Sequence, residues 1–156
     1  MIHVRRILLT LIMAFVALAT QAKAEDARGK ALFGSDCGLC HQRNGEGVAG
    51  QFPRLAGRVG LIAAKAEGKL YLAHVLAAGM TGAITIDGYT IAGYMPSFGQ
   101  VPAADVAAIL TYVTGLGGTP PVVFTTAEIE AARTPILSAR AVHDQRVKLV
   151  AAKIVP

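Results

Sequence analysis

Two cysteines and a histidine stand close together in the segment Cys37-Gly38-Leu39-Cys40-His41. Two thiols separated by two residues and followed directly by an imidazole form the attachment signal for c-type haem. Each thiol can add to one vinyl group of a porphyrin, and the adjacent histidine then lies under the iron. The segment therefore predicts one covalently attached haem c, with Cys37 and Cys40 as attachment points and His41 as the proximal iron ligand.

Three other kinds of site use cysteines at this spacing. A thioredoxin-like dithiol belongs at a strand-to-helix junction, whereas residues 26–36 have a helical pattern. A zinc site needs about four ligands, and the adjacent Cys40 and His41 would strain a tetrahedral arrangement. A disulfide across two residues would close a very small loop and contribute little stability. Haem attachment is the interpretation that these residues favour.

A second residue is needed to orient the histidine. A ligating histidine nearly always donates its other ring N–H to an acceptor, which fixes the orientation of the ring. Pro53 follows a polar, glycine-rich stretch at 42–50 and offers a free carbonyl at a fixed backbone angle. We expect this carbonyl to accept the hydrogen bond from His41; a plain turn proline is the alternative.

The sixth iron ligand decides the function, because a vacant site binds gases or peroxide whereas two strong ligands make an electron carrier. The candidates are Met80, Met95, His74 and His143. Met95 lies in a turn-rich segment with no helical face to fill, and Pro96 stiffens the chain behind it. We expect Met95 to be the ligand. A thioether favours ferrous iron and raises the potential above that of a bis-histidine site.

The elements that must position these residues are mostly helical. Helical patterns cover residues 25–36, 59–66, 69–78 and 102–115, with a break expected at Gly68 between the second and third. One stretch differs in kind. β-Branched residues flank Asp87-Gly88 within 83–91, which predicts a hairpin with a type I′ turn.

The first 24 residues have the pattern of an export signal. A positive start at 1–6 precedes an uncharged apolar run at 7–19, and Ala22-Lys23-Ala24 supplies a cleavage site. The run is short for a membrane span. We therefore expect a cleaved signal peptide and a periplasmic protein, with membrane contact only through an uncleaved N-terminal segment. Removing residues 1–24 leaves 12 basic against 10 acidic residues, so the pI near 9.5 is no argument for nucleic-acid binding.

The last part of the chain has helix signals of its own. Pro120-Pro121 marks a break, so we divide the exported chain into a domain at 25–118 and a helical C-terminal extension at 119–156. Thr125 and Glu128 form a capping box, and a second helix is expected from Ser138. The apolar residues of the extension either pack onto the preceding domain or make its second helix a docking or membrane-surface element. We favour packing by Phe124, Ile129, Val142, Leu149 and Val150.

Residues 25–118 resemble a class I c-type cytochrome of the bacterial periplasmic, mono-haem, His/Met-ligated kind. The resemblance rests on the haem motif and on the residues Gly29 and Phe33, Pro53-x-Leu55-x-Gly57, Met95-Pro96-x-Phe98 and Ile109-x-x-Tyr112. It implies an all-α fold, here with a small β-hairpin before the methionine-ligand loop and a helical C-terminal extension. It also implies that the first and last helices of the family fold cross where Gly29 meets Tyr112.

The resemblance implies an electron carrier rather than an enzyme. Its partners would be redox proteins, with a periplasmic dehydrogenase as donor and an oxidase or another cytochrome as acceptor. Two alternatives stay open: a dedicated cytochrome c subunit of a dehydrogenase or terminal-oxidase complex, and a haem sensor or peroxidase-like enzyme. Candidate partners for the haem propionates are Arg54, Arg58, Tyr71 and Tyr89.

Overall fold

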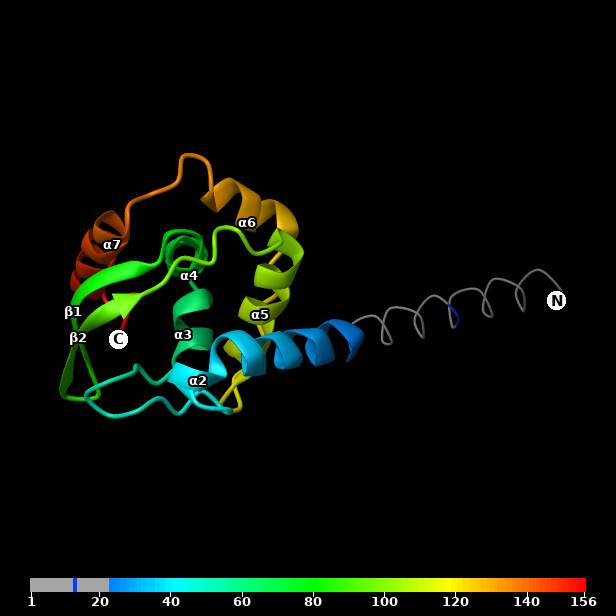
Figure 1. The fold of residues 1–156 in the computed structure, drawn as a ribbon, viewed down its shortest axis with the longest axis horizontal. Coiled ribbons are helices and arrows are strands. Elements are labelled where there is room, and N and C mark those ends of the chain that lie inside the picture. Colours follow the sequence, from blue (N-terminus) through cyan, green and yellow to red (C-terminus); the bar gives the residue numbers. More distant parts are fainter. Residues whose placement is uncertain (1–12, 14–22) are drawn as a thin grey trace, which may run out of the picture.

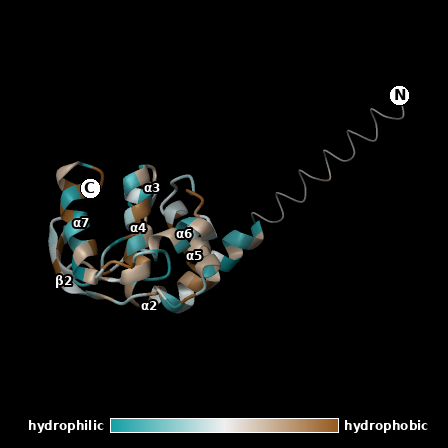
Figure 2. Cartoon of the chain, turned by 90° about the horizontal axis from the view of Figure 1, so that it is seen from above, coloured by the Kyte–Doolittle hydropathy of each residue, from teal (hydrophilic) through white to brown (hydrophobic). Residues whose placement is uncertain are grey.

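The computed structural model describes Met13 and residues 23–156. Nearly all of the expected signal peptide therefore lies outside the described residues. Residues 23–36 are helical, and the first turns of this helix are hydrophilic and project from the rest of the chain (Figures 1 and 2). Within the described residues, no helix combines the length and the apolar character needed to cross a membrane.

The described part of the chain is mostly helical, with one two-stranded antiparallel sheet. After residues 23–36, the elements in chain order are α2 Gly38–His41, α3 Val59–Ala63, α4 Ala66–Ala78, β1 Met80–Ile86, β2 Tyr89–Met95, α5 Ala103–Gly115, α6 Thr126–Ala132 and α7 Ala139–Ala151. Helices α4 and α5 supply much of the buried apolar cluster, to which Phe33, α3, α6 and α7 also contribute.

The hairpin is longer than expected. Its turn is at Asp87-Gly88, and both residues have positive φ values of 51° and 81°, as a type I′ turn requires. The strands continue beyond residues 83–91, however, so that Met80 pairs with Met95 at the open end of the sheet. The expectation that Met95 stands in a turn-rich segment was therefore wrong: Met95 is the last residue of β2.

Gly29 lies where the N-terminal helix crosses α5. A methyl group at Gly29 would overlap the Ala108 carbonyl oxygen and lie 2.8 Å from Tyr112 Cβ. The rings of Phe33 and Tyr112 meet one turn further along, with centroids 5.8 Å apart. The expected crossing of Gly29 and Tyr112 is confirmed, and its physical reason is that only glycine lets the two backbones approach so closely.

Gly68 has a different role from the one expected. The break between the two helices falls at residues 64–65, and Gly68 is buried inside α4. A methyl group there would overlap the Ile62 carbonyl oxygen at the end of α3. Gly68 thus permits close packing of α4 against α3 and does not interrupt the helix.

The C-terminal helices pack onto the rest of the chain. Phe124, Ile129, Val142 and Leu149 belong to the same buried cluster as the residues of α4 and α5, which confirms packing for these four. The prediction for Val150 was wrong, because 45% of its surface is exposed. Helix α7 lies beside β1 and α4 in Figure 1, and α6 lies beside α5.

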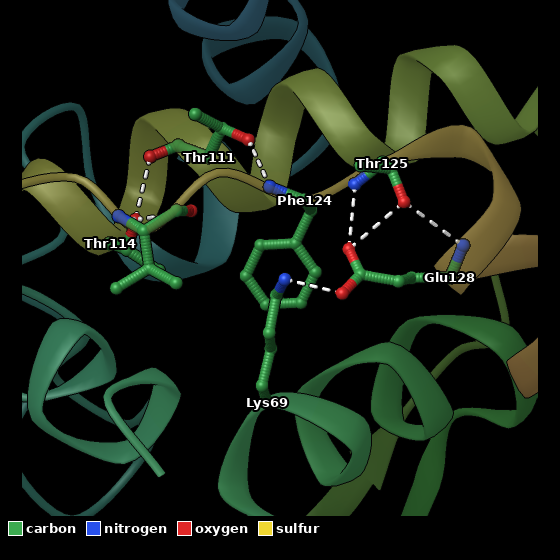
Figure 3. Close-up of polar contacts among 7 residues, drawn as sticks. Lys69, Thr111, Thr114, Phe124, Thr125 and Glu128 are labelled. Atoms are coloured by element: carbon green, nitrogen blue, oxygen red, sulfur yellow. Dashed lines mark hydrogen bonds and ion pairs between the residues drawn. The ribbon is translucent and has the colours of Figure 1, made fainter. Parts of the chain in front are cut away.

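The start of α6 is specified by its own residues. Thr125 and Glu128 form the expected capping box, with Glu128 N donating to Thr125 Oγ1 at 3.2 Å and Thr125 N donating to Glu128 Oε2 at 2.8 Å. Lys69 of α4 reaches the same carboxylate at 2.5 Å, and its ammonium group lies 5.0 Å from the centre of the Phe124 ring (Figure 3). This group of contacts holds α6 on α4.

Candidate functional site

The haem motif lies in a continuous helical stretch. Cys37 N donates to Phe33 O at 3.0 Å, and His41 N donates to Cys37 O at 2.9 Å, so α2 follows directly on the N-terminal helix. Both thiols are free and half-buried, and His41 is buried with 7% of its surface exposed. One short helix therefore presents two thiols and an imidazole together.

The His41 ring is oriented by Pro53. Its Nδ1 lies 2.9 Å from the Pro53 carbonyl oxygen, which can only accept, so Nδ1 carries the proton and donates. Nε2 then keeps its lone pair, as a metal ligand must. Burial lowers the pKa of His41, partly opposed by the hydrogen bond to Pro53. A lowered pKa favours the neutral imidazole at neutral pH.

The loop that carries Pro53 is closed by backbone contacts. Gly47 N donates to His41 O at 2.9 Å, and Val48 forms an isolated bridge with Phe52. Gly47 has a φ of 68°, and a side chain there would lie 2.7 Å from Arg54 N. The loop therefore needs glycine at this position, both for the backbone conformation and for the close approach of the two chain segments.

Two adjoining cavities bring the candidate site residues together. The residues that line both cavities are Cys37, His41, Pro53, Met80, Ile84 and Met95. The first cavity is also lined by Cys40, Gln51, Phe52, Tyr94 and Phe98, and the second extends inward to α4, α5 and α7. The thiols, the oriented imidazole and the thioether expected from sequence therefore face one shared, mainly apolar space.

Both candidate methionines border this space. Directly opposed residues of an antiparallel pair point to the same face of the sheet, so Met80 and Met95 lie side by side. The two differ in what their sulfurs contact: Tyr71 donates its hydroxyl to Met80 Sδ at 3.4 Å. Met80 and Met95 both pack against the main apolar cluster, and Met80 also packs against the smaller cluster of Ile84, Ile86 and Ile91 in the sheet. Met80 thus has more contacts outside the shared space than Met95 has.

The two histidine candidates have other contacts. His74 Nδ1 lies 2.9 Å from Gln145 Oε1, and His143 Nε2 lies 2.9 Å from the Ala83 carbonyl oxygen. Neither histidine lines the two cavities. The histidines instead connect α7 to α4 and to β1.

The second cavity contains two buried cations. Arg58 and Arg146 line it with only 7% and 6% of their surfaces exposed, beside the buried Tyr71. Burial and the neighbouring charge of Arg146 lower the pKa of Arg58. Burial raises the pKa of Tyr71, while the charges of Arg146 and Arg58 oppose that rise. Buried charges are normally paired, so this end of the cavity fits an anionic group.

Sequence reasoning missed Arg146, and it named one residue, Tyr89, that lies away from both cavities. Arg54 does line the second cavity, but its side chain is half-exposed and forms a forked ion pair with Asp87, with distances of 2.8 and 3.0 Å. Tyr89 is 53% exposed and lines neither cavity. The signal for Arg146 was its helical spacing, because it lies four residues after Val142 and three before Leu149, on the buried side of α7.

These residues fit a haem c. The two thiols suit its vinyl groups, the free His41 Nε2 and a thioether suit its iron, and the buried arginines suit its carboxylates. Burial, with smaller effects from Asp36 and Cys40, raises the pKa of the Cys37 thiol to about 11, so this thiol is protonated at neutral pH in the haem-free chain.

Comparison with known proteins agrees with this geometry. Residues 27–117 match the family described as cytochrome c. The chain is 37% identical over 143 residues to a cytochrome c-552 of Thermus thermophilus, covering 88% of this chain and 95% of the relative. It is 38% identical over 120 residues to another cytochrome c-552 of the same organism, covering 74% of this chain and 92% of the relative. The chain belongs to the cytochrome c family, whose members carry covalently attached haem c and transfer electrons with redox partners.

Proposed function

We propose that this protein is a periplasmic mono-haem cytochrome that carries single electrons between redox proteins. The observation that carries the proposal is the shared space bordered by Cys37, Cys40, the oriented His41 and Met95. Bound haem supplies an iron that alternates between the ferrous and ferric states. The protein binds and orients this group, surrounds it with apolar side chains and excludes water from it.

In this proposal Cys37 and Cys40 would attach the porphyrin, and His41 and Met95 would be the ligands of its iron. The Pro53 carbonyl holds the His41 ring in position through Nδ1. Met95 is preferred over Met80 because the Met80 sulfur already accepts the Tyr71 hydroxyl and its side chain fills space between two apolar clusters. Arg58 and Arg146 pair with the haem carboxylates.

Electron transfer then needs a partner at the exposed edge of the first cavity. Leu39 is 87% exposed between the two cysteines, and Phe52 and Tyr94 are exposed residues that line this cavity. Electron-transfer contacts are typically smaller than about 1,200 Å² and short-lived. The donor would be a periplasmic dehydrogenase and the acceptor an oxidase or another cytochrome. The export signal at residues 1–24 supports the periplasmic location.

The experiment replaces each methionine in turn. Met95→Ala is expected to abolish the weak far-red charge-transfer band of ferric iron bound to a thioether, and to open the iron to added ligands. Met80→Ala is the matched control, because Met80 pairs directly with Met95 on the same face of the sheet. This variant should keep the band. The reverse pattern would assign the ligand to Met80.

A second measurement separates the carrier from a sensor or peroxidase-like enzyme. Those functions need a vacant or labile sixth position. The reduced wild-type protein should therefore fail to bind carbon monoxide at neutral pH. Rapid binding would overturn the assignment as a simple carrier.

A further inference from the structure

The segment that follows Met95 is fixed on one side by the end of α4. Phe98 N donates to Leu76 O at 2.8 Å, and Ser97 Oγ donates to Ala77 O at 2.6 Å. The last carbonyls of a helix have no partner within the helix, so these bonds also satisfy the end of α4. Gly79 adds a close approach, because a side chain there would overlap the Met95 carbonyl oxygen.

The other side of the segment is held by a residue of the C-terminal part of the chain. Arg133 follows α6 directly and is largely buried, with 16% of its side chain exposed. Its Nη2 donates to Val101 O at 2.6 Å and lies 3.4 Å from Phe98 O. Val101 N in turn donates to Phe98 O at 3.0 Å. One guanidinium group therefore binds both carbonyls of the turn at 98–101.

The Arg133 side chain is committed to this contact. Its Nη1 lies 3.7 Å from the Glu130 carboxylate, which offsets part of the charge, and its Nε is buried without a hydrogen-bond partner in the described structure. Leaving a buried donor unpaired costs free energy. The shorter contacts of the Arg133 guanidinium are thus with the Val101 and Phe98 carbonyl oxygens, and its ion pair with Glu130 is longer.

We propose that Arg133 is a positioning residue for Met95. It fixes the segment 96–101 between α4 and α6, and this segment continues directly from Met95. Phe98, whose carbonyl faces Arg133, also lines the first cavity and packs against the core. Without Arg133, two carbonyls lose a charged donor and the segment gains freedom to move. The thioether then leaves its position more often. This inference rests on Met95 as the axial ligand.

The test measures how often the thioether leaves the ferric iron. Imidazole binds to the ferric holoprotein only after the sixth ligand has left, so its binding rate reports this opening. Arg133→Gln is expected to raise the rate about tenfold, since a charged hydrogen bond is lost. Arg133→Lys keeps the charge with fewer donors and should lie between Arg133→Gln and the wild type. If Arg133→Gln yields no holoprotein, the imidazole binding rate of Arg133→Lys is compared with that of the wild type instead.

Arg140→Gln is the matched control. Arg140 is an exposed arginine of α7 whose partner in the described structure is Asp144 at 3.2 Å, and its loss should leave the imidazole rate unchanged. The melting temperature is recorded for each variant. If the Arg133 variants melt earlier but bind imidazole at the wild-type rate, Arg133 is merely structural and the inference fails. If Met95→Ala keeps the charge-transfer band, the ligand assignment itself fails, whatever the Arg133 variants do.

Discussion

The two guanidinium groups of Arg58 and Arg146 stand out among the individual residues. They lie in the second cavity, each more than nine-tenths buried, and burial, followed by the neighbouring charge of Arg146, lowers the pKa of Arg58. In the haem-bound protein the carboxylates of the haem would balance them. Arg58 also donates to the Pro156 carbonyl oxygen, which ties it to the C-terminal part of the chain.

We expect Arg146→Gln to lower the midpoint potential. Removing a positive charge near the iron favours the ferric form, which carries more positive charge, over the ferrous form. The expected shift is roughly 10–100 mV, from the Coulomb energy of one charge at an effective dielectric constant near 20. A spectroelectrochemical titration measures it. Arg146→Lys keeps the charge and should stay close to the wild type; an unchanged or higher potential in Arg146→Gln would contradict the assignment.

At the scale of the elements, the crossing of the N-terminal helix and α5 depends on Gly29, which has no side chain. We expect Gly29→Ala to destabilise the protein by about 1–3 kcal/mol, because the new methyl group would overlap the Ala108 carbonyl. Gly34→Ala on the same helix is the control. Among the described residues, none outside this helix lies within 4 Å of a methyl group at Gly34, so the substitution should raise stability by about 1 kcal/mol. Denaturant unfolding curves compare the two variants.

The start of α6 depends on two polar side chains. We expect Thr125→Ala to lower the free energy of unfolding by about 1 kcal/mol, because the Glu128 N–H loses its acceptor and the capping box is broken. Urea unfolding followed by circular dichroism measures the change. The haem spectrum should stay as in the wild type, since Thr125 lines neither cavity.

The contacts of Glu128 with Lys69 and Thr125 make the stability of the protein pH-dependent. The hydrogen bond from Lys69, together with those from Thr125, lowers the pKa of Glu128. A carboxyl group whose pKa is lower in the folded than in the unfolded chain stabilises above the unfolded value, about 4.3, and loses this effect as the pH falls. Glu128→Gln should therefore destabilise the protein at pH 7 and approach the wild type near pH 3. A difference that stays constant over this range would contradict the prediction.

At the scale of the whole molecule, the C-terminal helices complete the core. Their buried side chains join the cluster formed by α4 and α5, and His74–Gln145, His143–Ala83 and Arg133–Val101 add polar contacts. Helix α7 also places Arg146 in the second cavity. Residues on both sides of Gly118 thus share one core. The division into a domain at 25–118 and an extension at 119–156 stays a prediction.

Truncation after Gly118 tests that division. We expect the shortened protein to lose on the order of 5 kcal/mol of stability, since several large apolar side chains leave the core, and to melt at a clearly lower temperature. The haem should stay attached and His41-ligated, because Cys37, Cys40 and His41 lie before the cut, whereas the loss of Arg133 should let the Met95 thioether leave the iron more often. An unchanged melting temperature with slower electron transfer to a native partner would instead identify the C-terminal part as a docking element.

The sequence alone determined those features that depend on neighbouring residues or on fixed spacing. The haem motif, the turn at Asp87-Gly88 and the capping box of α6 each rest on a few adjacent residues whose chemistry permits little else. The prediction that Gly29 meets Tyr112 came from the resemblance to class I c-type cytochromes, and the structure confirms the contact.

Only the tertiary structure decided what depends on distant partners. It extended the hairpin until Met80 opposed Met95, turned Gly68 from a helix break into a packing contact, and placed Arg146 in the second cavity. The length of a paired strand depends on its partner strand, and the role of a glycine depends on which backbone approaches it. A buried arginine is recognisable only once the cavity around it exists, because the same side chain on a solvated helix face is ordinary.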